Sequence, residues 1–440
     1  MPDVIVIGGG LAGLAAAAAL GTAGYGVQLL EARGFLGGRA TSYPLSQSDG
    51  DTATIDNCQH ILLRCCVNLL DFYERLNARE HIRFHREFFF LEPGGRMSTL
   101  KAGIFPAPAH FAGSFFHLRF LSTADKIAVG RAIAALRSEW SSRQDLDRIT
   151  MLQWLEEKRQ TPRAIQRFWR QVLVSAINED LDRMAALHGF QVFHLGFLAR
   201  ADSYQMGIPA VPLGELYGVE AWKRFDSVRI VLRSAVERIV IDNSTVREVT
   251  VAGASRRADF YVCCLPFERV PTVAPDLPLD LSSFSHSPIT GIHLWFDRPV
   301  TDLPHATLLD RTIQWMFNKD RGRYVQVVVS ASRSLVEMSR ADVIELATRE
   351  LAEFFPAVRK ARLEKAHVVK ELRATFSAAP GLEQKRPASV TPVKNLFLGG
   401  DWTRSGWPAT MEGAVRSGYL AAEAVTAAAG APQRFLLNNL

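Results

Sequence analysis

The sequence predicts a mixed α/β fold, in which a Rossmann-type domain is interleaved with a substrate domain that has a mixed sheet and a helical insertion. The first observation is a βαβ unit: an apolar run at residues 4–7, an alanine-rich helical segment at 11–20 and a second apolar run at 27–30. The second is the return of strand patterns at 228–262 and 291–331. The third is a strand at 396–398, followed by a glycine-rich turn and a helix from about residue 411.

Helical periodicity dominates the stretch from about residue 84 to residue 200. Val129, Ile133, Leu136 and Trp140 recur at helical spacing, and basic residues stand between them. We therefore expect a helical layer here, and a further helix at 341–355. No repeat or long linker separates the segments, so both domains are expected to be discontinuous in the sequence.

Composition excludes several classes of protein. Of the 440 residues, 48% are hydrophobic and 22% are charged, which is typical of a globular chain. Lys and Arg exceed Asp and Glu by 51 to 45 without forming a dense basic run, so we expect no nucleic-acid partner. The five cysteines lack CxxC spacing, which indicates neither a disulfide framework nor a metal site and fits a reducing cytoplasm.

The N-terminus lacks a secretory pattern, so we expect no exported protein. Prolines, histidines and Arg119 interrupt the longest apolar stretch, so no transmembrane helix is expected.

The segment after the first strand carries a GxGxxG pattern. Its first glycine permits a tight turn, its second lets a pyrophosphate approach the backbone, and its third allows close packing of helix on strand. The N-terminus of the following helix offers free N–H groups and a positive dipole end to the phosphates. The pattern predicts a bound dinucleotide, with candidate contacts at Gly8, Gly10, Leu11, Ala12 and Gly13.

Glu31 supports the dinucleotide site, because it ends the second strand about 20 residues after the glycines, where an acid accepts ribose hydroxyls. Two further motifs then separate FAD from NAD. A second glycine pair with an arginine follows Glu31, and the chain closes with Leu-Phe-Leu-Gly-Gly-Asp-Trp at 396–402 and Met-Glu-Gly-Ala-Val at 411–415. Both motifs resemble those of the flavin amine oxidase superfamily, which implies FAD as the cofactor. The contacts implied by this resemblance are Glu31, Ala32, Arg33, Gly37, Gly38, Arg39, the backbone of Val236 at the adenine, Gly400, Asp401 at the ribityl chain, and the backbone of Met411 and Glu412 at the flavin edge.

Residues 55–61 narrow the resemblance. They read Ile-Asp-Asn-Cys-Gln-His-Ile and are followed by Leu-Leu-Asp-Phe-Tyr at 69–73. This closely resembles the signature of the squalene-associated, FAD-dependent desaturase-like family, understood as hydroxysqualene dehydroxylases. Segments 294–300 and 314–319 look like the same family, so the resemblance covers nearly the whole chain. It adds Asn57 to the cofactor contacts and makes Gln59 and His60 the catalytic candidates.

The resemblance implies reductive dehydroxylation of hydroxysqualene to squalene, as in bacterial squalene and hopanoid biosynthesis. Reduced FAD supplies a hydride, and a proton donor assists the departure of the hydroxyl oxygen. His60 is the candidate acid, because an imidazole titrates close to neutral pH. Other squalene-pathway enzymes are expected partners. An electron donor must reduce FAD, and the sequence does not identify it.

Other functions stay open. A desaturase of phytoene or another polyene uses the same fold and oxidises its substrate, whereas a redox-silent flavoprotein would bind flavin and lipid as a scaffold. An amine oxidase is disfavoured, because Thr410 stands where those enzymes often place an aromatic residue next to the amine. Trp402 and Trp407 remain candidates for a wall of the site.

The expected substrate dissolves in lipid, so we expect a cytoplasmic protein attached peripherally to the inner face of the cell membrane. The expected mouth lies in the helical insertion, where apolar side chains cluster near Arg119 and Lys126: Phe105, Phe111, Phe115, Phe116, Phe120 and Leu121. On this reading, residues 1–83, 201–272 and 385–440 form the FAD-binding domain. Residues 84–200 and 273–384 form the substrate-binding domain.

Overall fold

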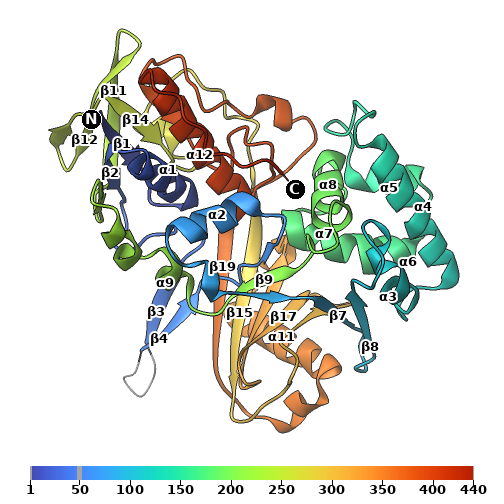
Figure 1. The fold of residues 1–440 in the computed structure, drawn as a ribbon. Coiled ribbons are helices and arrows are strands. Elements are labelled where there is room, and N and C mark those ends of the chain that lie inside the picture. The colour runs from blue at the N-terminus through green and yellow to red at the C-terminus, as the bar shows by residue number, and fades with distance from the viewer. Residues whose placement is uncertain (1, 47–51, 440) are drawn as a thin grey trace.

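A five-stranded parallel sheet forms one end of the molecule in the computed structural model, which describes residues 2–46 and 52–439 (Figure 1). The expected βαβ unit is confirmed, since a strand, a helix and a strand follow one another from residue 3 to residue 30. In spatial order, the strands are β10 (Val228–Val231), β2 (Gly26–Leu30), β1 (Asp3–Ile7), β14 (Phe260–Cys263) and β20 (Leu396–Leu398).

The two faces of this sheet are covered differently. Val4 and Val6 of β1 pack in one cluster with α1 (Leu11–Thr22) and α12 (Met411–Ala428). Ile5 and Ile7 point to the opposite face, because side chains alternate along a strand. That face is covered by a small antiparallel sheet made of β11 (Val236–Asp242), β12 (Thr245–Val251) and β13 (Ala254–Arg256).

A seven-stranded mixed sheet forms the second layer. All its neighbouring strands pair antiparallel except β16 with β7. Helix α11 (Arg340–Phe354) packs on one face, and the other face looks toward the helices drawn at the right of Figure 1. In spatial order, the strands are β19 (Leu363–Phe376), β15 (His286–Phe296), β18 (Tyr324–Ser330), β17 (Trp315–Asp320), β16 (His305–Leu308), β7 (Glu87–Leu91) and β8 (Met97–Lys101).

The helical layer begins later than expected. The expectation of helix from residue 84 is wrong for its first part, which forms the end of β6, β7 and β8. The run Phe88-Phe89-Phe90 favours a strand, and Gly94 and Gly95, with φ of +92° and +83°, turn the chain into a hairpin. The layer itself contains α3 (Ala112–Phe116), α4 (Thr123–Glu139), α5 (Met151–Glu157), α6 (Pro162–Ala164), α7 (Arg170–Ile177) and α8 (Ala186–Phe193), with π-helical turns at Ile165–Trp169 and His194–Leu198.

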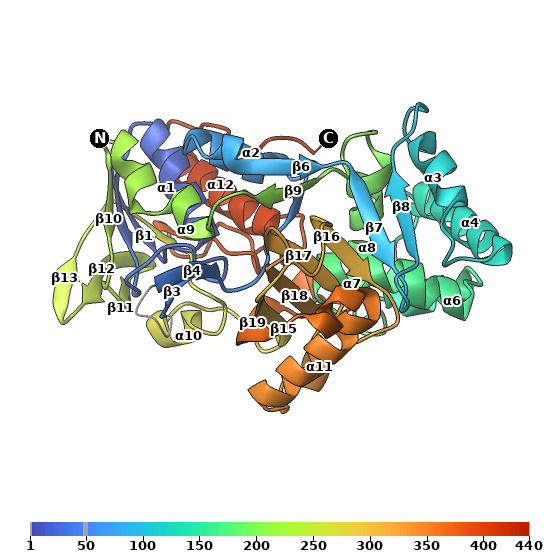
Figure 2. The same cartoon turned by 90° about the horizontal axis from the view of Figure 1, so that it is seen from below.

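Short elements join the two large sheets. Helix α2 (Val67–Arg75) packs against α12, and Figure 2 shows both on the same side of the molecule as α1. The remaining elements are β3 (Ser42–Ser46) with β4 (Thr52–Asp56), β5 (Leu62–Leu63) with β9 (Met206–Pro209) and β6 (Ile82–His85), and the helices α9 (Leu213–Tyr217) and α10 (Val270–Val273).

No helix in the described ranges is long and apolar enough to cross a membrane.

Candidate functional site

The glycine-rich turn between β1 and α1 needs its glycines for two different reasons. Gly8 has a φ of +104°, which side chains rarely tolerate. At Gly13, a Cβ atom would lie 1.9 Å from the carbonyl oxygen of Gly8, so only hydrogen fits. Gly10 precedes the helix, and no side chain caps the N–H groups of Leu11 and Ala12. The turn therefore presents an open helix N-terminus with the geometry of an anion site.

Glu31 holds this turn from the end of β2. One of its carboxylate oxygens accepts a hydrogen bond of 2.6 Å from the N–H of Gly9, and the other accepts one of 2.7 Å from the N–H of Arg33, which follows Ala32. A carboxylate has lone pairs left after two such bonds, so Glu31 can still accept from a ribose. The carbonyl of Glu31 also accepts from the N–H of Ser234, which brings the start of β11 and Val236 close to it.

The second glycine pair docks on the first turn. Gly37 donates its N–H to the carbonyl of Gly9 at 2.8 Å, and Gly37 and Gly38 both have positive φ. The guanidinium of Arg39 then lies 3.5 Å from the carboxylate of Asp401 and 3.6 Å from that of Glu268. Gly400, with a φ of +135°, shapes the turn before Asp401 and donates its N–H to Ser417. Motifs that lie at opposite ends of the chain thus meet at one place.

The N-terminus of α12 is the other end of the site. Thr410 caps it by accepting from the N–H of Gly413 at 3.0 Å. The side chain of Glu412 turns away and reaches the N-terminus of α2, where its oxygens accept from the N–H groups of Asn68 and Leu69 and from the Asn68 amide at 2.7–3.2 Å. Burial raises the pKa of Glu412 against these hydrogen bonds. Glu412 therefore joins two helices, a role that the sequence did not reveal.

The segment from Asp56 to His60 connects the two sheets. Asn57 is buried, donates to the carbonyl of Arg39 at 2.8 Å and exchanges hydrogen bonds with Thr41. The Gln59 oxygen accepts from the ammonium of Lys319 at 3.0 Å, and this ammonium lies 3.7 Å from the carboxylate of Asp56. Burial lowers the pKa of Lys319, and Asp56 opposes the shift. The segment is thus held in place by charge-assisted contacts.

His60 contacts the backbone of its own segment. Its Nδ1 is 3.0 Å from the carbonyl oxygen of Cys58, which can only accept, so Nδ1 carries a proton. Burial lowers the pKa of His60, although Asp56 and the carbonyl of Cys58 oppose the shift. The structure therefore does not favour the cationic form that a proton donor uses. The catalytic role of His60 and Gln59 stays a prediction.

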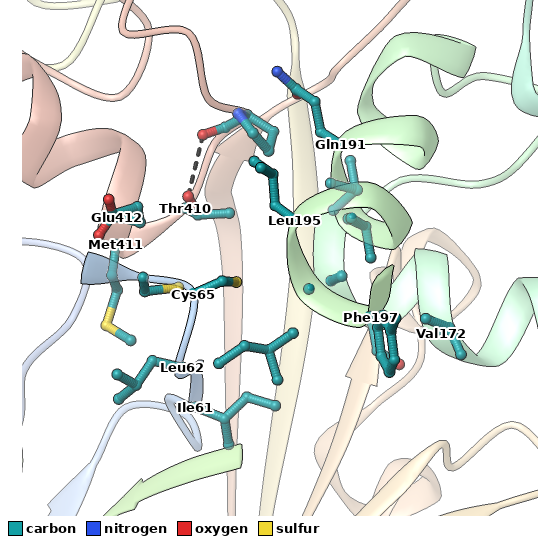
Figure 3. Close-up of a pocket in the computed structure, with 18 of the residues that line it drawn as sticks. Ile61, Leu62, Cys65, Val172, Gln191, Leu195, Phe197, Thr410, Met411 and Glu412 are labelled. Atoms are coloured by element: carbon teal, nitrogen blue, oxygen red, sulfur yellow. Dashed lines mark hydrogen bonds between the residues drawn. The ribbon is translucent and has the colours of Figure 1, made fainter. Parts of the chain in front are cut away.

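An apolar cavity opens beside these elements (Figure 3). It runs between α7 and α8 on one side and the N-termini of α2 and α12 on the other. In the part of the chain that the structure describes, Glu412 is the only charged side chain in its lining, and neither Gln59 nor His60 belongs to it. Trp407 lines the cavity, whereas Trp402 is core and donates to the carbonyl of Leu265.

The comparison with protein families decides the class. The family model described as flavin containing amine oxidoreductase matches residues 11–426, which is nearly the whole chain. The chain belongs to this family. The family also explains why glycine motifs at both ends of the sequence converge on one site, and the expected superfamily is confirmed.

Curated relatives of this chain include carotenoid desaturases. The 15-cis-phytoene desaturase of Synechococcus elongatus is 26% identical over 469 residues, which cover 96% of each chain. The zeta-carotene desaturase of a Synechocystis strain is 24% identical, with 96% of this chain and 97% of the relative covered. The chain is a flavin-dependent oxidoreductase of the carotenoid desaturase type.

Solved structures show the same fold. An oxidoreductase from Methanosarcina mazei matches with a TM-score of 0.71 at 17% identity, covering 94% of this chain and 98% of its own. Putrescine oxidase bound to putrescine matches with a TM-score of 0.70 at 16% identity, and 98% of each chain is covered. These matches confirm the predicted mixed α/β fold.

FAD is the cofactor of this family member, as expected, and the residues present fit it. Nη2 of Arg39 and Oε2 of Glu268 are buried beside the glycine turn without a hydrogen-bond partner among the described residues. Beyond its ion pairs with Asp401 and Glu268, the Arg39 guanidinium thus keeps an N–H without a hydrogen bond next to an open helix N-terminus, which matches a pyrophosphate. FAD would be held by the turn at 8–13, by Glu31 and by Arg39, and it would supply hydride transfer. Glu268 had no signal in the sequence.

Proposed function

We propose that this protein is an FAD-dependent oxidoreductase that acts on a long isoprenoid. The observation that supports this most directly is the cavity, because its lining is almost entirely apolar and it reaches Met411 and Glu412 at the N-terminus of α12. The only acidic side chain that a small amine would meet among the described lining residues is Glu412, whose carboxylate is already tied to the start of α2 by three hydrogen bonds.

Desaturation of a polyene is the first candidate reaction. The relatives named as phytoene and zeta-carotene desaturases match over the full length, and they favour this alternative over dehydroxylation. An apolar cavity suits a hydrocarbon that carries no polar group. In this reaction the substrate loses hydride and a proton, and FAD takes up the hydride.

Dehydroxylation of hydroxysqualene is the second candidate. A specific feature supports it: the segment Asp56 to His60, which resembles the dehydroxylase signature, is tied to Arg39 and Lys319 by the hydrogen bonds of Asn57 and Gln59. In this reaction a carbon–oxygen bond is replaced by a carbon–hydrogen bond, and the hydroxyl leaves as water after protonation. Bound FAD in its reduced form would supply the hydride, so the cell must provide a reductant.

One anaerobic experiment separates the two reactions. Reduced holoenzyme in detergent is mixed with hydroxysqualene, oxidised holoenzyme is mixed with phytoene, and flavin absorption and extracted lipids are followed. Reoxidation with squalene formation establishes dehydroxylation, whereas bleaching with formation of a longer polyene establishes desaturation. A flavin that responds to neither lipid, in a protein that nevertheless binds both, would indicate the redox-silent scaffold.

We also propose that the protein attaches peripherally to the inner face of the cell membrane through the start of the helical layer. Ile104 is 96% exposed, Phe116 67%, Phe105 55% and Ile127 51%, and Lys126 stands among them. Such a patch of apolar side chains with a cation suits a lipid surface.

Some of the apolar side chains expected at the mouth are buried in this structure, and others are exposed. Phe120 and Leu121 are buried in the core, so the expectation that they face lipid is wrong. Phe111 is half-buried and packs 6.1 Å, between ring centroids, from Phe197, which lines the cavity. Phe111 therefore connects the start of the helical layer with the cavity wall. Failure of the protein to float with anionic vesicles, or equal flotation of a Phe105→Ser/Phe116→Ser variant, would refute the attachment.

A further inference from the structure

The cavity wall contains a glycine, Gly196, that the backbone does not require. Gly196 is buried in the π-helical turn His194–Leu198, and its φ lies outside the positive range. Apart from its own helix backbone and chain neighbours, a Cβ atom built there would have one described atom within 4 Å, Cδ1 of Leu63 at 3.0 Å. Glycine is unfavourable inside a helix, so its presence indicates that the space beside it has another use.

Leu63 approaches Gly196 from the opposite wall. Both residues line the cavity, and Leu63 ends the short strand β5, whereas Gly196 follows α8. In Figure 3, Leu62 lies on one side of the cavity, and Leu195 and Phe197, which flank Gly196, lie on the other. A methyl group at residue 196 would already touch Leu63, and a longer side chain would project into the open space beside it.

This pair of residues lies at the boundary between two hydrophobic clusters. Leu195 belongs to the cluster of α1, α2 and α12, whereas Phe197 belongs to the cluster that contains one face of the seven-stranded sheet. Leu63 packs against both clusters. The cavity therefore has two parts: a cofactor compartment, lined by Cys65, Leu69 and Trp407, and a sheet compartment, lined by Phe88, Leu100 and Trp315.

We infer that Gly196 and Leu63 form a neck between the two compartments, which makes the cavity specific for an extended, acyclic isoprenoid chain that occupies both. The reacting part of the chain lies in the cofactor compartment, and the remainder passes beside Leu63 through the space that a side chain at residue 196 would fill. A cyclic end group is wider than an extended chain, so the neck excludes it. The π-helical turn fits this role, because such turns are rare and are frequent at functional sites. The inference rests on the proposed isoprenoid substrate and adds its length and shape.

Two acyclic hydrocarbons of different length test the neck. Labelled squalene and labelled farnesene, a chain of half its length, are bound to immobilised holoenzyme in one detergent. The ratio of their dissociation constants is compared between variants, because detergent partitioning cancels in this comparison. Farnesene needs the cofactor compartment alone, whereas squalene must pass the neck. Each CH₂ group kept out of the cavity lowers affinity about fourfold, so the exclusion of four weakens binding more than about a hundredfold.

Gly196→Leu fills the neck, and Gly130→Leu is the matched control. Gly130 also lies in a helix, α4, with no described atom within 4 Å of its Cβ position. Gly196→Leu should weaken the binding of squalene more than about a hundredfold and that of farnesene less than about threefold. Adding Leu63→Ala, which makes room on the opposite wall, should restore squalene to within about tenfold of wild type. Gly130→Leu should change neither lipid.

Leu63→Ala alone provides a second measurement, because it widens the neck without adding a side chain. Wild type should bind acyclic lycopene more tightly than β-carotene, which has cyclic ends, and Leu63→Ala should reduce this preference several-fold. The substitution removes only part of one side chain, so this measurement decides the inference if Gly196→Leu does not fold.

Each outcome supports or overturns the neck. A selective loss of squalene in Gly196→Leu that Leu63→Ala reverses, with FAD retained, supports it. Equal changes for squalene and farnesene, or no change for either, overturn it while leaving the isoprenoid substrate in place. An unchanged preference for lycopene in Leu63→Ala also overturns it. Failure of the wild type to bind any of these hydrocarbons refutes the proposed isoprenoid function and the neck with it.

Discussion

Replacing His305 by Phe should remove a source of acid instability. His305 lies on β16 with its ring fully buried, and neither ring nitrogen has a hydrogen-bond partner among the described residues. Its neighbours are aromatic: ring centroids of His85, Phe89 and Trp315 lie 5.0, 5.4 and 6.3 Å away. Burial, together with the charge of His85, lowers the pKa of His305 to about 3. A phenylalanine ring suits this site without a titratable group.

The size of the effect follows from proton linkage. In the unfolded chain a histidine has a pKa of about 6.5, so the unfolded state binds the proton first as the pH falls. Because the folded pKa is the lower one, the stability is complete above about pH 6.5 and is lost progressively down to about pH 3. At pH 5, which is about 1.5 units below the unfolded pKa, the loss is about 2 kcal/mol at 1.36 kcal/mol per unit. At pH 7 it is close to zero.

Urea unfolding of the holoprotein at pH 7 and pH 5 measures this difference. His305→Phe should lose about 2 kcal/mol less than wild type between the two values. Phe317→Leu is the control, because Phe317 lies next to His305 and its replacement reduces packing equally at both pH values. If the wild type and His305→Phe lose the same stability between pH 7 and pH 5, a buried and unprotonated His305 is refuted.

Two further predictions concern the cofactor end. Gly13→Ala should reduce the FAD content of the purified protein and cost about 1–3 kcal/mol in a thermal scan, because its Cβ would meet the carbonyl of Gly8. Gly130→Ala, where a Cβ meets nothing within 4 Å in α4, should instead stabilise by up to about 1 kcal/mol. Glu412→Gln should cost about 2 kcal/mol in urea unfolding, because one amide oxygen cannot replace two carboxylate oxygens at the start of α2. Equal stability of Glu412→Gln and wild type would refute the contact.

Local motifs could be predicted from the sequence because the contacts that determine them lie between residues close to each other in the chain. The turn at Gly8 and the close packing at Gly13 depend on neighbouring backbone, and the structure places both as expected. Strand β19 gave no signal, because it is an edge strand with many charged, half-exposed residues. Likewise, the aromatic run at 88–90 was hidden within a stretch dominated by helical periodicity.

The cavity could not be predicted, because its lining comes from five distant segments: 61–69, 88–100, 171–197, 307–315 and 407–412. Only the packing of the seven-stranded sheet against α7 and α8 brings these segments together. A buried polar atom without a hydrogen-bond partner, such as Oε1 of Gln171, could not be predicted from the sequence either, because it depends on which groups surround it in the fold.

The carboxylate of Glu412 joins the cofactor end of the site to the cavity. It is bound by the N-terminus of α2, where Cys66 directly before the helix and Leu69 in its first turn line the cavity together with Met411. A shift of α12 would therefore break three buried hydrogen bonds or carry α2 with it, and the cavity wall would move in either case. Because the helix that is predicted to face the flavin and the wall of the cavity proposed for the substrate share this contact, their separation is fixed before either ligand binds. Such preorganisation is what transfer of a hydride between two bound molecules requires.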